Sequence, residues 1–395
     1  MKKIIARFFF KTKGVFFRRM QAICFIVAVP ITAQAFLRDQ IASLNTEYDV
    51  YLAGNIKGKN DVKGLDIVGW QHIDIERSVS IWKDLKATWQ LAIYFRKMKF
   101  AAVHSVTPKA GLITALAGWF AGIKTRIHIF TGQVWCTRRG IKRFILKSLD
   151  RLIVGLDNHL LVDGEGQRQF LIKEKVLTEE NSIVLGHGSI CGVNLERFST
   201  DGIARRRVRN ELHLSDDRIV FVFMGRLNHD KGMYDLLPAF NRLAGERADV
   251  FLLLIGFDEE NVASRFEDYC HLKRNENCLY YGPTSEPHIL LQAGDVFVLP
   301  TYREGFGSSV IEASALGLPV ICSNAYGVLD AMIDNVTGLR CNVGDSDSLY
   351  QAMKTLSDNK DFRLELGRAG KKRVEEYFDS RLITSLWVEF YHSVL

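Results

Sequence analysis

The sequence predicts an α/β protein with two parallel-sheet domains. Short apolar runs alternate with helical patterns along the whole chain, which is the order that parallel sheets with crossover helices require. A length of 395 residues allows two domains of ordinary size, each with its own core. The charged share of 25% and the apolar share of 47% indicate a globular chain and exclude a disordered one.

The expected elements follow along the chain. In the first half, apolar runs predict strands at 23–29, 49–53, 100–104, 126–130 and 160–162, and helices that include 110–121 and 141–152. The stretch 194–214 has the composition of a connector. The second half predicts strands at 219–224, 250–255, 279–281, 296–299 and 319–322, and helices at 361–377 and 380–394. This order divides the chain into an N-terminal extension (1–20), a first domain (21–195), a second domain (196–378) and a C-terminal helix (379–395).

The charge is unevenly placed along the chain. Residues 1–195 carry 29 Lys and Arg against 15 Asp and Glu, whereas residues 196–395 carry 23 against 30. A basic half indicates an anionic partner surface. Nucleic acid is the generic candidate, but no nucleic-acid-binding motif is present, and the mixture of cations with bulky apolar residues favours a membrane interface. The seven scattered cysteines lack a C-x-x-C pair, which fits a reducing cytosol.

The first 38 residues contain cations and phenylalanines but no acid. A basic start followed by the apolar run 22–29 resembles a signal peptide. Eight residues are too few to span a bilayer, so we interpret this run as the first strand of the first domain. The basic aromatic extension before it then either lies on anionic lipid or is a disordered, solvated tail.

The most informative window is 304–312, between a predicted strand and a helical pattern that starts at Ser309. It holds a glutamate at each end and a phenylalanine between two glycines. A helix N-terminus at the carboxyl end of a sheet binds ligands in open α/β folds, and its free N–H groups suit phosphate. Carboxylates at such a site point to sugar hydroxyls as well. The window therefore predicts a binding site for a nucleotide-linked sugar.

The spacing of Glu304 and Glu312 resembles the E-x7-E motif of retaining family 4 (group 1) glycosyltransferases, which have the GT-B fold. The segment from Gly225 through Lys231 to Gly232 is similar to the family's GRL-x3-KG element. Loops ending at 256 and 283 fall where the family has two further strand-end loops. The likeness is good over 180–378 and loose before it. It implies two Rossmann-like domains facing across a cleft, with the last helix crossing back onto the first domain.

The resemblance also implies which residues bind the donor. Arg226 and Lys231 correspond to the family's diphosphate-binding pair, which supplies fixed positive charge where negative charge develops. Glu304 corresponds to the glutamate at the donor sugar, and these three residues are the candidate catalytic set. Glu312 corresponds to the residue that holds the ribose hydroxyls. The other donor-binding candidates are Gly225, Gly282, Pro283, Gly305, Phe306, Gly307, Ser308 and Ser309, and no metal is expected.

Acceptor-side candidates are polar or small residues near strand ends of the first half. They are Arg38, His104, Lys109, His128, Thr131, Gly132, Gly188 and Ser189. Phe130 stands where many relatives have a histidine, and His128 can point the same way because side chains alternate along a strand. The alternative for His128 is a satisfied core residue. Arg38 lies where the family's glycine-rich loop is absent and is a candidate contact for an acceptor phosphate.

A second basic amphipathic segment covers 137–152. Its apolar residues fall at helical spacing, with cations on the flanks: Ile141, Phe144, Ile145, Leu149 and Leu152. This pattern fits either a core-facing helix with a wet face or a helix that docks on lipid.

Together these features predict a retaining, metal-independent glycosyltransferase at the inner face of the cell membrane, cytoplasmic and peripherally attached. The stretch 130–135 resembles bacterial enzymes that build O-antigen, capsule or protein-glycan repeats on a polyprenyl diphosphate. We expect a UDP-sugar donor, with N-acetylhexosamine as the sugar, and a membrane-embedded lipid-diphosphate saccharide as acceptor. We also expect an anionic membrane surface as partner, no cofactor and no nucleic acid.

Two other functions stay open. One is an isomerase of the same fold, like UDP-N-acetylglucosamine 2-epimerase, and the other is a non-catalytic GT-B subunit. The combination of GRL-x3-KG with E-x7-E argues against the isomerase. The presence of Arg226, Lys231, Glu304 and Glu312 argues against a silent subunit.

Overall fold

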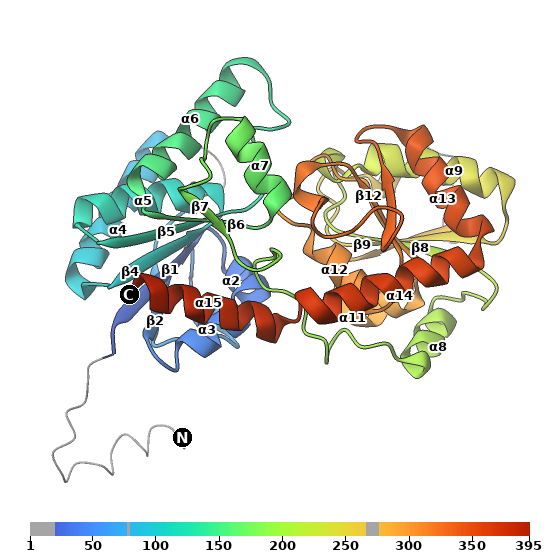
Figure 1. The fold of residues 1–395 in the computed structure, drawn as a ribbon, viewed down its shortest axis with the longest axis horizontal. Helices are drawn as coiled ribbons and strands as arrows, with labels where there is room; N and C mark the ends of the chain where they lie inside the picture. Colours follow the sequence, from blue (N-terminus) through green and yellow to red (C-terminus); the bar gives the residue numbers. More distant parts are fainter. Residues whose placement is uncertain (1–19, 77–79, 266–275) are drawn as a thin grey trace, which may run out of the picture.

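Two parallel sheets, one in each half of the chain, organise the computed structural model, which describes residues 20–76, 80–265 and 276–395 (Figure 1). The first sheet has the order β3-β2-β1-β4-β5-β6-β7. Its strands are β1 (Ala22–Val27), β2 (Asp49–Gly54), β3 (Gly69–His72), β4 (Ala102–Val106), β5 (Thr125–Phe130), β6 (His159–Val162) and β7 (Ser182–Val184). We call this sheet and the helices on it the N-terminal lobe.

The second sheet has the order β10-β9-β8-β11-β12-β13 and is also parallel throughout. Its strands are β8 (Ile219–Met224), β9 (Val250–Ile255), β10 (Cys278–Gly282), β11 (Val296–Leu299), β12 (Val320–Ser323) and β13 (Gly338–Cys341). The central strands are apolar on both faces because helices cover both sides of the sheet. We call this sheet and its helices the C-terminal lobe.

Helices cover both faces of each sheet. In the N-terminal lobe they are α2 (Pro30–Phe36), α3 (Arg38–Leu44), α4 (Ile81–Met98), α5 (Pro108–Ala121), α6 (Gly140–Leu156) and α7 (Glu165–Lys173). In the C-terminal lobe they are α8 (Gly202–Glu211), α9 (Met233–Glu246), α11 (Pro287–Leu290), α12 (Ser308–Ala315), α13 (Ser346–Asp358) and α14 (Lys360–Tyr377). Phe95 of α4 and Ile113 of α5 share one core cluster, whereas Ile41 of α3 belongs to another, so α3 and α4 pack on opposite faces of the first sheet.

The last helix, α15 (Ser380–Val394), returns to the N-terminal lobe and lies along α3 (Figure 1). Its Trp387 and Tyr391 are fully buried in the same cluster as Ile41. The two connections between the lobes run together, since Val193 N–H donates to Phe378 O at 2.7 Å and Ser380 N–H donates to Val193 O at 2.9 Å. The lobes are thus joined by a paired crossing and not by a single linker.

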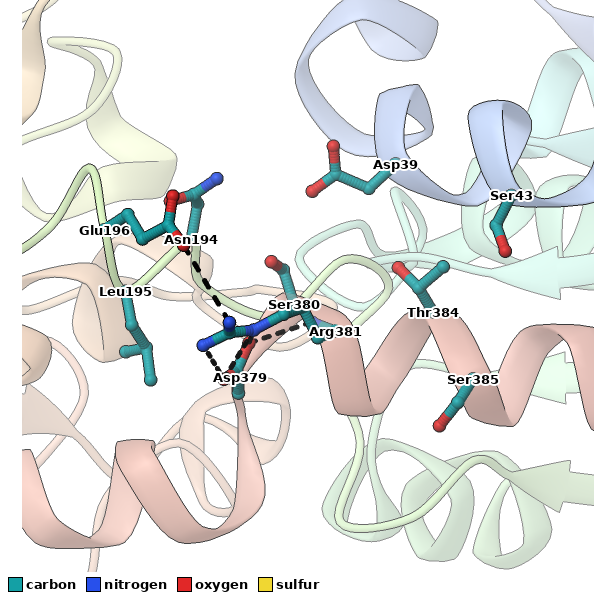
Figure 2. A pocket seen from close by; sticks show the side chains of 10 residues that line it. All are labelled: Asp39, Ser43, Asn194, Leu195, Glu196, Asp379, Ser380, Arg381, Thr384 and Ser385. Atoms are coloured by element: carbon teal, nitrogen blue, oxygen red, sulfur yellow. Dashed lines mark hydrogen bonds and ion pairs between the residues drawn. The ribbon is translucent and has the colours of Figure 1, made fainter.

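A cavity opens beside this crossing, between α3, the connector and the start of α15 (Figure 2). Acidic residues Asp39, Glu196 and Asp379 line it, and Arg381 contacts two of them, Asp379 at 3.0 Å and Glu196 at 3.8 Å. None of the donor-binding candidates lines this cavity. It belongs to the junction between the lobes.

The predicted fold class is confirmed, and every predicted strand overlaps an observed one. Three short strands were missed, β3, β7 and β13, because three or four residues give too little periodicity to stand out. The expected connector 194–214 contains α8, which Asp201 caps and whose Arg209 contacts Asp295. The extension 1–20 lies outside the described residues except for its last one.

Candidate active site

The loops that follow β8, β9, β10 and β11 form one edge of the second sheet, which we call the donor edge. Gly225 N–H donates to Ile255 O at 2.9 Å, and Gly256 N–H donates to Gly282 O at 3.0 Å, so three of these loops are joined in a row. Gly256 has φ +136°, and a Cβ there would lie 1.8 Å from Gly225 O. Glycine is therefore required where these strands end. Pro283 directly follows Gly282 at the end of β10 and is exposed at the same edge.

Arg226 leaves the end of β8 and is partly exposed. Its guanidinium binds both carboxylate oxygens of Glu259, at 3.1 and 2.9 Å. Asn228 donates to the same carboxylate at 2.7 Å. The pairing with Glu259 was not predicted, and it gives Arg226 a resting partner that an anionic ligand can replace.

Lys231 reaches across the donor edge to Glu304, and their side chains form an ion pair. The backbone makes this approach possible because Gly232 has φ +76° and a Cβ there would lie 1.9 Å from Pro300 O. Asn228 caps the short turn before Gly232 by accepting from Lys231 N–H at 3.1 Å. Two of the three candidate catalytic residues, Lys231 and Glu304, are therefore in direct contact.

The loop after β11 is held on both sides. Arg303 pairs with Asp230 at 2.8 Å, which ties this loop to the one that carries Lys231. Phe306 is buried against Phe378. Gly307, at φ +85°, precedes α12, whose first residue is Ser308 rather than the predicted Ser309. Gly305 to Ser309 thus lead into a helix N-terminus that opens at the donor edge.

Glu312 lies one turn into α12 and is half-buried. Burial raises the pKa of its carboxyl to about 7, although the nearby Arg197 acts in the opposite direction. A carboxyl in this setting is costly to ionise unless hydroxyl or N–H donors approach it.

The N-terminal lobe meets the donor edge through the loops after β5 and β6, which we call the acceptor edge. A Cβ on Gly132 would lie 2.9 Å from the carbonyl carbon of Glu304, and one on Gly305 would lie 2.5 Å from Asp163 Oδ2. A Cβ on Gly188 would lie 2.8 Å from the ring of Phe306. The lobes therefore touch at small residues, and Thr131 backbone lies in the same contact.

Asp163 is the main residue that the sequence analysis missed. It directly follows β6, is buried, and its Oδ1 has no hydrogen-bond partner in the described part of the chain. Burial, with a smaller contribution from Glu304, raises the pKa of Asp163 to about 8. The available signal was its position, since it is the first polar residue after a predicted strand.

Tyr326 makes a second contact between the lobes that was not predicted. Its hydroxyl accepts from Gln133 N–H at 3.0 Å, and its ring stacks on Phe170 of α7 at 4.0 Å. Gly166 N–H also donates to Asp330 at 2.7 Å. These bonds fix the acceptor edge against the C-terminal lobe.

The acceptor-side assignment of two histidines was wrong, because both are core residues. His104 is fully buried, stacks on Trp387 at 5.0 Å and hydrogen-bonds the hydroxyl of Tyr391 at 3.0 Å. His128 is also fully buried, and its Nδ1 lies 2.8 Å from Ser105 Oγ. Burial lowers the pKa of both imidazoles, that of His128 to about 3, so both are neutral.

Of three further acceptor-side candidates, two have structural partners and one is exposed. Lys109 pairs with Asp84 at 2.8 Å and joins α5 to α4. Ser189 is buried, and its Oγ accepts from Gly192 N–H at 3.0 Å. Arg38 is exposed at the start of α3, with its guanidinium near Gly64. Of the acceptor-side set, Thr131, Gly132 and Gly188 lie against the Glu304 loop or the Phe306 ring.

Comparison with known proteins identifies the family. The family described as "Glycosyl transferases group 1" matches residues 204–373. The capsular polysaccharide biosynthesis glycosyltransferase CapM of Staphylococcus aureus is 31% identical over 324 residues, which cover 82% of this chain and 84% of CapM. The chain belongs to the group 1 glycosyltransferases.

A second relative of the glycosyltransferase is the N,N'-diacetylbacillosaminyl-diphospho-undecaprenol alpha-1,3-N-acetylgalactosaminyltransferase of Campylobacter jejuni. It is 25% identical over 79% of this chain and 82% of its own length. Among solved structures, Anabaena HepE in complex with UDP and glucose superposes with a TM-score of 0.78 at 16% identity, covering 94% of this chain and all of HepE. The enzyme therefore has the GT-B fold, as predicted.

Proposed function

We propose that the enzyme transfers a sugar from a UDP-sugar to a lipid-diphosphate-linked saccharide during assembly of a bacterial surface polysaccharide. The observation that carries this proposal is the donor edge. There, Arg226, Lys231 and the N-terminus of α12 lie on adjoining loops, and Glu304 contacts Lys231. Two cations and a helix N-terminus suit a diphosphate, while the two glutamates suit sugar hydroxyls.

We further propose that transfer retains the anomeric configuration and needs no metal ion. Arg226 and Lys231 would neutralise the leaving diphosphate, so the protein itself supplies the positive charge. When a diphosphate binds, Arg226 releases Glu259 and binds phosphate oxygens instead. Lys231 then turns from Glu304 toward the diphosphate. Both histidines of the acceptor-side set are buried and neutral, which supports a mechanism in which the leaving phosphate helps to take the acceptor proton.

The donor assignment rests on chemistry and on relatives. HepE is described with UDP and glucose, and the Campylobacter relative is named for transfer of N-acetylgalactosamine. Exposed Pro283 and half-buried Thr284 follow β10 beside Gly256, and we propose that their backbone groups read the base. We propose UDP as the nucleotide and N-acetylhexosamine as the sugar.

The acceptor assignment rests on the same relatives. The Campylobacter enzyme is named for an undecaprenyl-diphosphate-linked acceptor and CapM for capsule synthesis. None of the helices in the described part of the chain is both long and apolar enough to cross a bilayer. We propose that the enzyme reaches its lipid-linked acceptor from the cytoplasmic surface of the membrane.

The deciding experiment incubates the protein with radiolabelled UDP-sugars, with and without a polyprenyl-diphosphate saccharide. We expect label to move to the lipid only when the acceptor is present, and calorimetry to detect UDP binding. Conversion of UDP-sugar without acceptor would indicate an isomerase, and binding without any turnover would indicate a silent subunit. A protein that binds neither UDP nor any UDP-sugar would contradict the proposal entirely.

A further inference from the structure

The outer surface of α4 carries a stripe of large apolar side chains. Trp82, Leu85, Trp89 and Ile93 recur at helical spacing and are 83%, 55%, 64% and 51% exposed. The opposite side of the same helix holds Leu91 and Phe95, which are buried in the core. The core of the lobe therefore does not account for this stripe.

The helices beside α4 continue the surface. α5 packs against both α4 and α6, so the three helices are neighbours in the order α4, α5, α6. Trp119 and Phe120 at the end of α5 are at least half exposed, and the T-shaped contact between their rings has a centroid distance of 5.1 Å. Figure 1 shows α4 and α5 on the side of the N-terminal lobe that faces away from the C-terminal lobe.

On α6, the apolar stripe noted in the sequence is open to solvent. Ile141 is 78% exposed, Phe144 69% and Ile145 51%, while the buried residues of this helix are Asp150 and Ile153. Of the two interpretations of this stripe, the core-facing helix is therefore wrong. Soluble monomers rarely expose an apolar surface that extends over several neighbouring helices unless it binds something.

The charge on this stretch is almost entirely positive. From the start of α4 to the end of α6, residues 81–156 contain fourteen Lys and Arg and two acids. Of the acids, Asp84 pairs with Lys109, and Asp150 is buried and accepts from Trp135 Nε1 at 2.7 Å. The exposed cations include Lys86, Arg96, Lys97, Lys99, Lys124, Arg138, Arg139 and Lys142.

The surface also adjoins the active site through one loop. Gly132 contacts the Glu304 backbone at the acceptor edge, and the chain then runs directly through Arg138 and Arg139 into α6. A lipid-linked acceptor must bring its diphosphate to this edge while its tail stays in the bilayer. The segment after Gly132 connects this edge to the start of α6.

We propose that the outer face of α4, α5 and α6 docks on an anionic lipid bilayer, with the tryptophans and Phe144 in the interface and the cations at the headgroups. Tryptophan suits this position because its ring is apolar and its N–H is polar. Basic residues without exposed acids between them match an anionic headgroup layer and not a protein surface of mixed charge. This inference rests on the proposed lipid-linked acceptor for its function, but not for its geometry.

The first test measures binding of the full chain to vesicles by flotation. We expect binding to vesicles that contain phosphatidylglycerol, weaker binding to pure phosphatidylcholine, and release by salt. The double variant Trp82→Ser/Trp89→Ser should bind at least about tenfold more weakly, because large interfacial area is lost. Lys142→Glu should weaken binding to anionic vesicles by about fivefold or more.

Two matched controls lie in the C-terminal lobe. Ile203 of α8 is 72% exposed, so Ile203→Ser should leave vesicle binding unchanged while Ile141→Ser weakens it. Lys372 of α14 is exposed, so Lys372→Glu should also leave binding unchanged. Residues 1–19 stay in every variant. If that segment alone bound lipid, the face variants would bind as well as the unmodified chain, and the inference would be wrong.

A second test locates the tryptophans directly. Vesicles with brominated acyl chains should quench the fluorescence of the full chain. The variant Trp82→Phe/Trp89→Phe/Trp119→Phe should still bind but lose most of that quenching. Of the three tryptophans that remain, Trp135 and Trp387 are buried, and Trp70 lies on β3 and not on the three helices of the face. Undiminished quenching would overturn the inference. A dimer in sedimentation that the Trp82→Ser/Trp89→Ser variant dissociates, without vesicle binding by either protein, would overturn it too.

The two proposals fail in different ways. UDP binding measured by calorimetry depends on the donor edge and should be equal in the face variants and the unmodified chain. Loss of vesicle binding with intact UDP binding supports the docking face. If the unmodified chain bound UDP and ignored every vesicle, only the docking inference would fall. If it bound vesicles and no UDP, only the proposed function would fall.

Discussion

The donor edge and the acceptor edge are both strand-end loops of parallel sheets, yet they are built differently. At the donor edge, the conformation of each loop is determined by its own residues. Gly232 and Gly256 have backbone conformations that other residues rarely adopt. At the acceptor edge, the loops after β5 and β6 are placed by contacts with the other lobe, through Gly132, Asp163 and Tyr326. The donor site is therefore a property of one lobe, and the acceptor site a property of the pair.

This difference predicts how substitutions should separate binding from turnover. Changes at the donor edge should abolish recognition of the nucleotide. Changes at the contact between the lobes should leave nucleotide binding intact and slow transfer, because the reacting groups come together only when the lobes meet.

The largest effect is expected from Lys231→Ala or Arg226→Ala. Either change removes a cation from the place where the diphosphate leaves, and loss of one such group lowers kcat by about 100- to 1000-fold. Transfer from a UDP-sugar to the lipid-linked acceptor measures the loss.

Lys354 provides the control for these variants. It forms an ion pair with Asp358 on α13, at the surface, so Lys354→Ala should transfer at the normal rate. Thermal unfolding shows whether each variant is folded. A folded Lys231→Ala enzyme with normal turnover would remove Lys231 from the site.

The next effect is expected from Gly132→Ala on the acceptor edge. Gly132 has no left-handed backbone requirement, so alanine strains only the contact across the lobes, where its Cβ would lie 2.9 Å from the carbonyl carbon of Glu304. We expect UDP binding within error of the unmodified chain and kcat lowered by about 10- to 100-fold, since small misplacements of reacting groups are costly.

Gly245→Ala is the matched control, because no atom of the described residues outside the backbone of α9 lies within 4 Å of a Cβ built there. It should be neutral or slightly stabilising within α9. If Gly132→Ala lowered UDP binding and kcat by the same factor, the two edges would not differ as proposed.

The same distinction decides what the sequence could predict. The GRL-x3-KG and E-x7-E segments fix local backbone geometry, so Arg226, Lys231, Glu304 and the start of α12 could be placed from the sequence. His104 could not, because its partner Tyr391 is 287 residues away and arrives with α15. Periodicity likewise predicted the α6 stripe but not its direction, since the buried side of α6 is set by its packing on α5. Asp163 carried a usable signal only in its position after a strand.

A smaller and pH-dependent effect is expected at Asp163. Its folded pKa of about 8 lies above the ordinary value of 3.8, so the folded state holds a proton that the unfolded chain has lost. Stability should therefore fall as the pH rises between the two values and level off above about 8. Asp163→Asn, which mimics the neutral acid, should lose this dependence.

The measurement is the unfolding midpoint from pH 5 to pH 9 for both proteins, together with kcat. Above pH 8, the carboxylate of Asp163 would face Glu304 in the unmodified enzyme, so transfer should decline there by a few-fold and Asp163→Asn should resist that decline. If the unfolding midpoints of the two proteins changed with pH in the same way, Asp163 would ionise freely and would not be a neutral group between the lobes.

The smallest effect on transfer is expected from His104→Ala, although its effect on stability is large. His104 is stacked between Phe25 and Trp387, and removing the ring leaves a cavity beneath α15, which should cost about 2–4 kcal/mol of unfolding free energy. His392 on the same helix is half exposed and pairs with Glu47, so His392→Ala should cost less than about 1 kcal/mol. Transfer per folded molecule should be normal in both variants, because the His104 ring packs in the core and not at the acceptor edge. A folded His104→Ala enzyme with a large loss of kcat and normal UDP binding would restore His104 to the acceptor site.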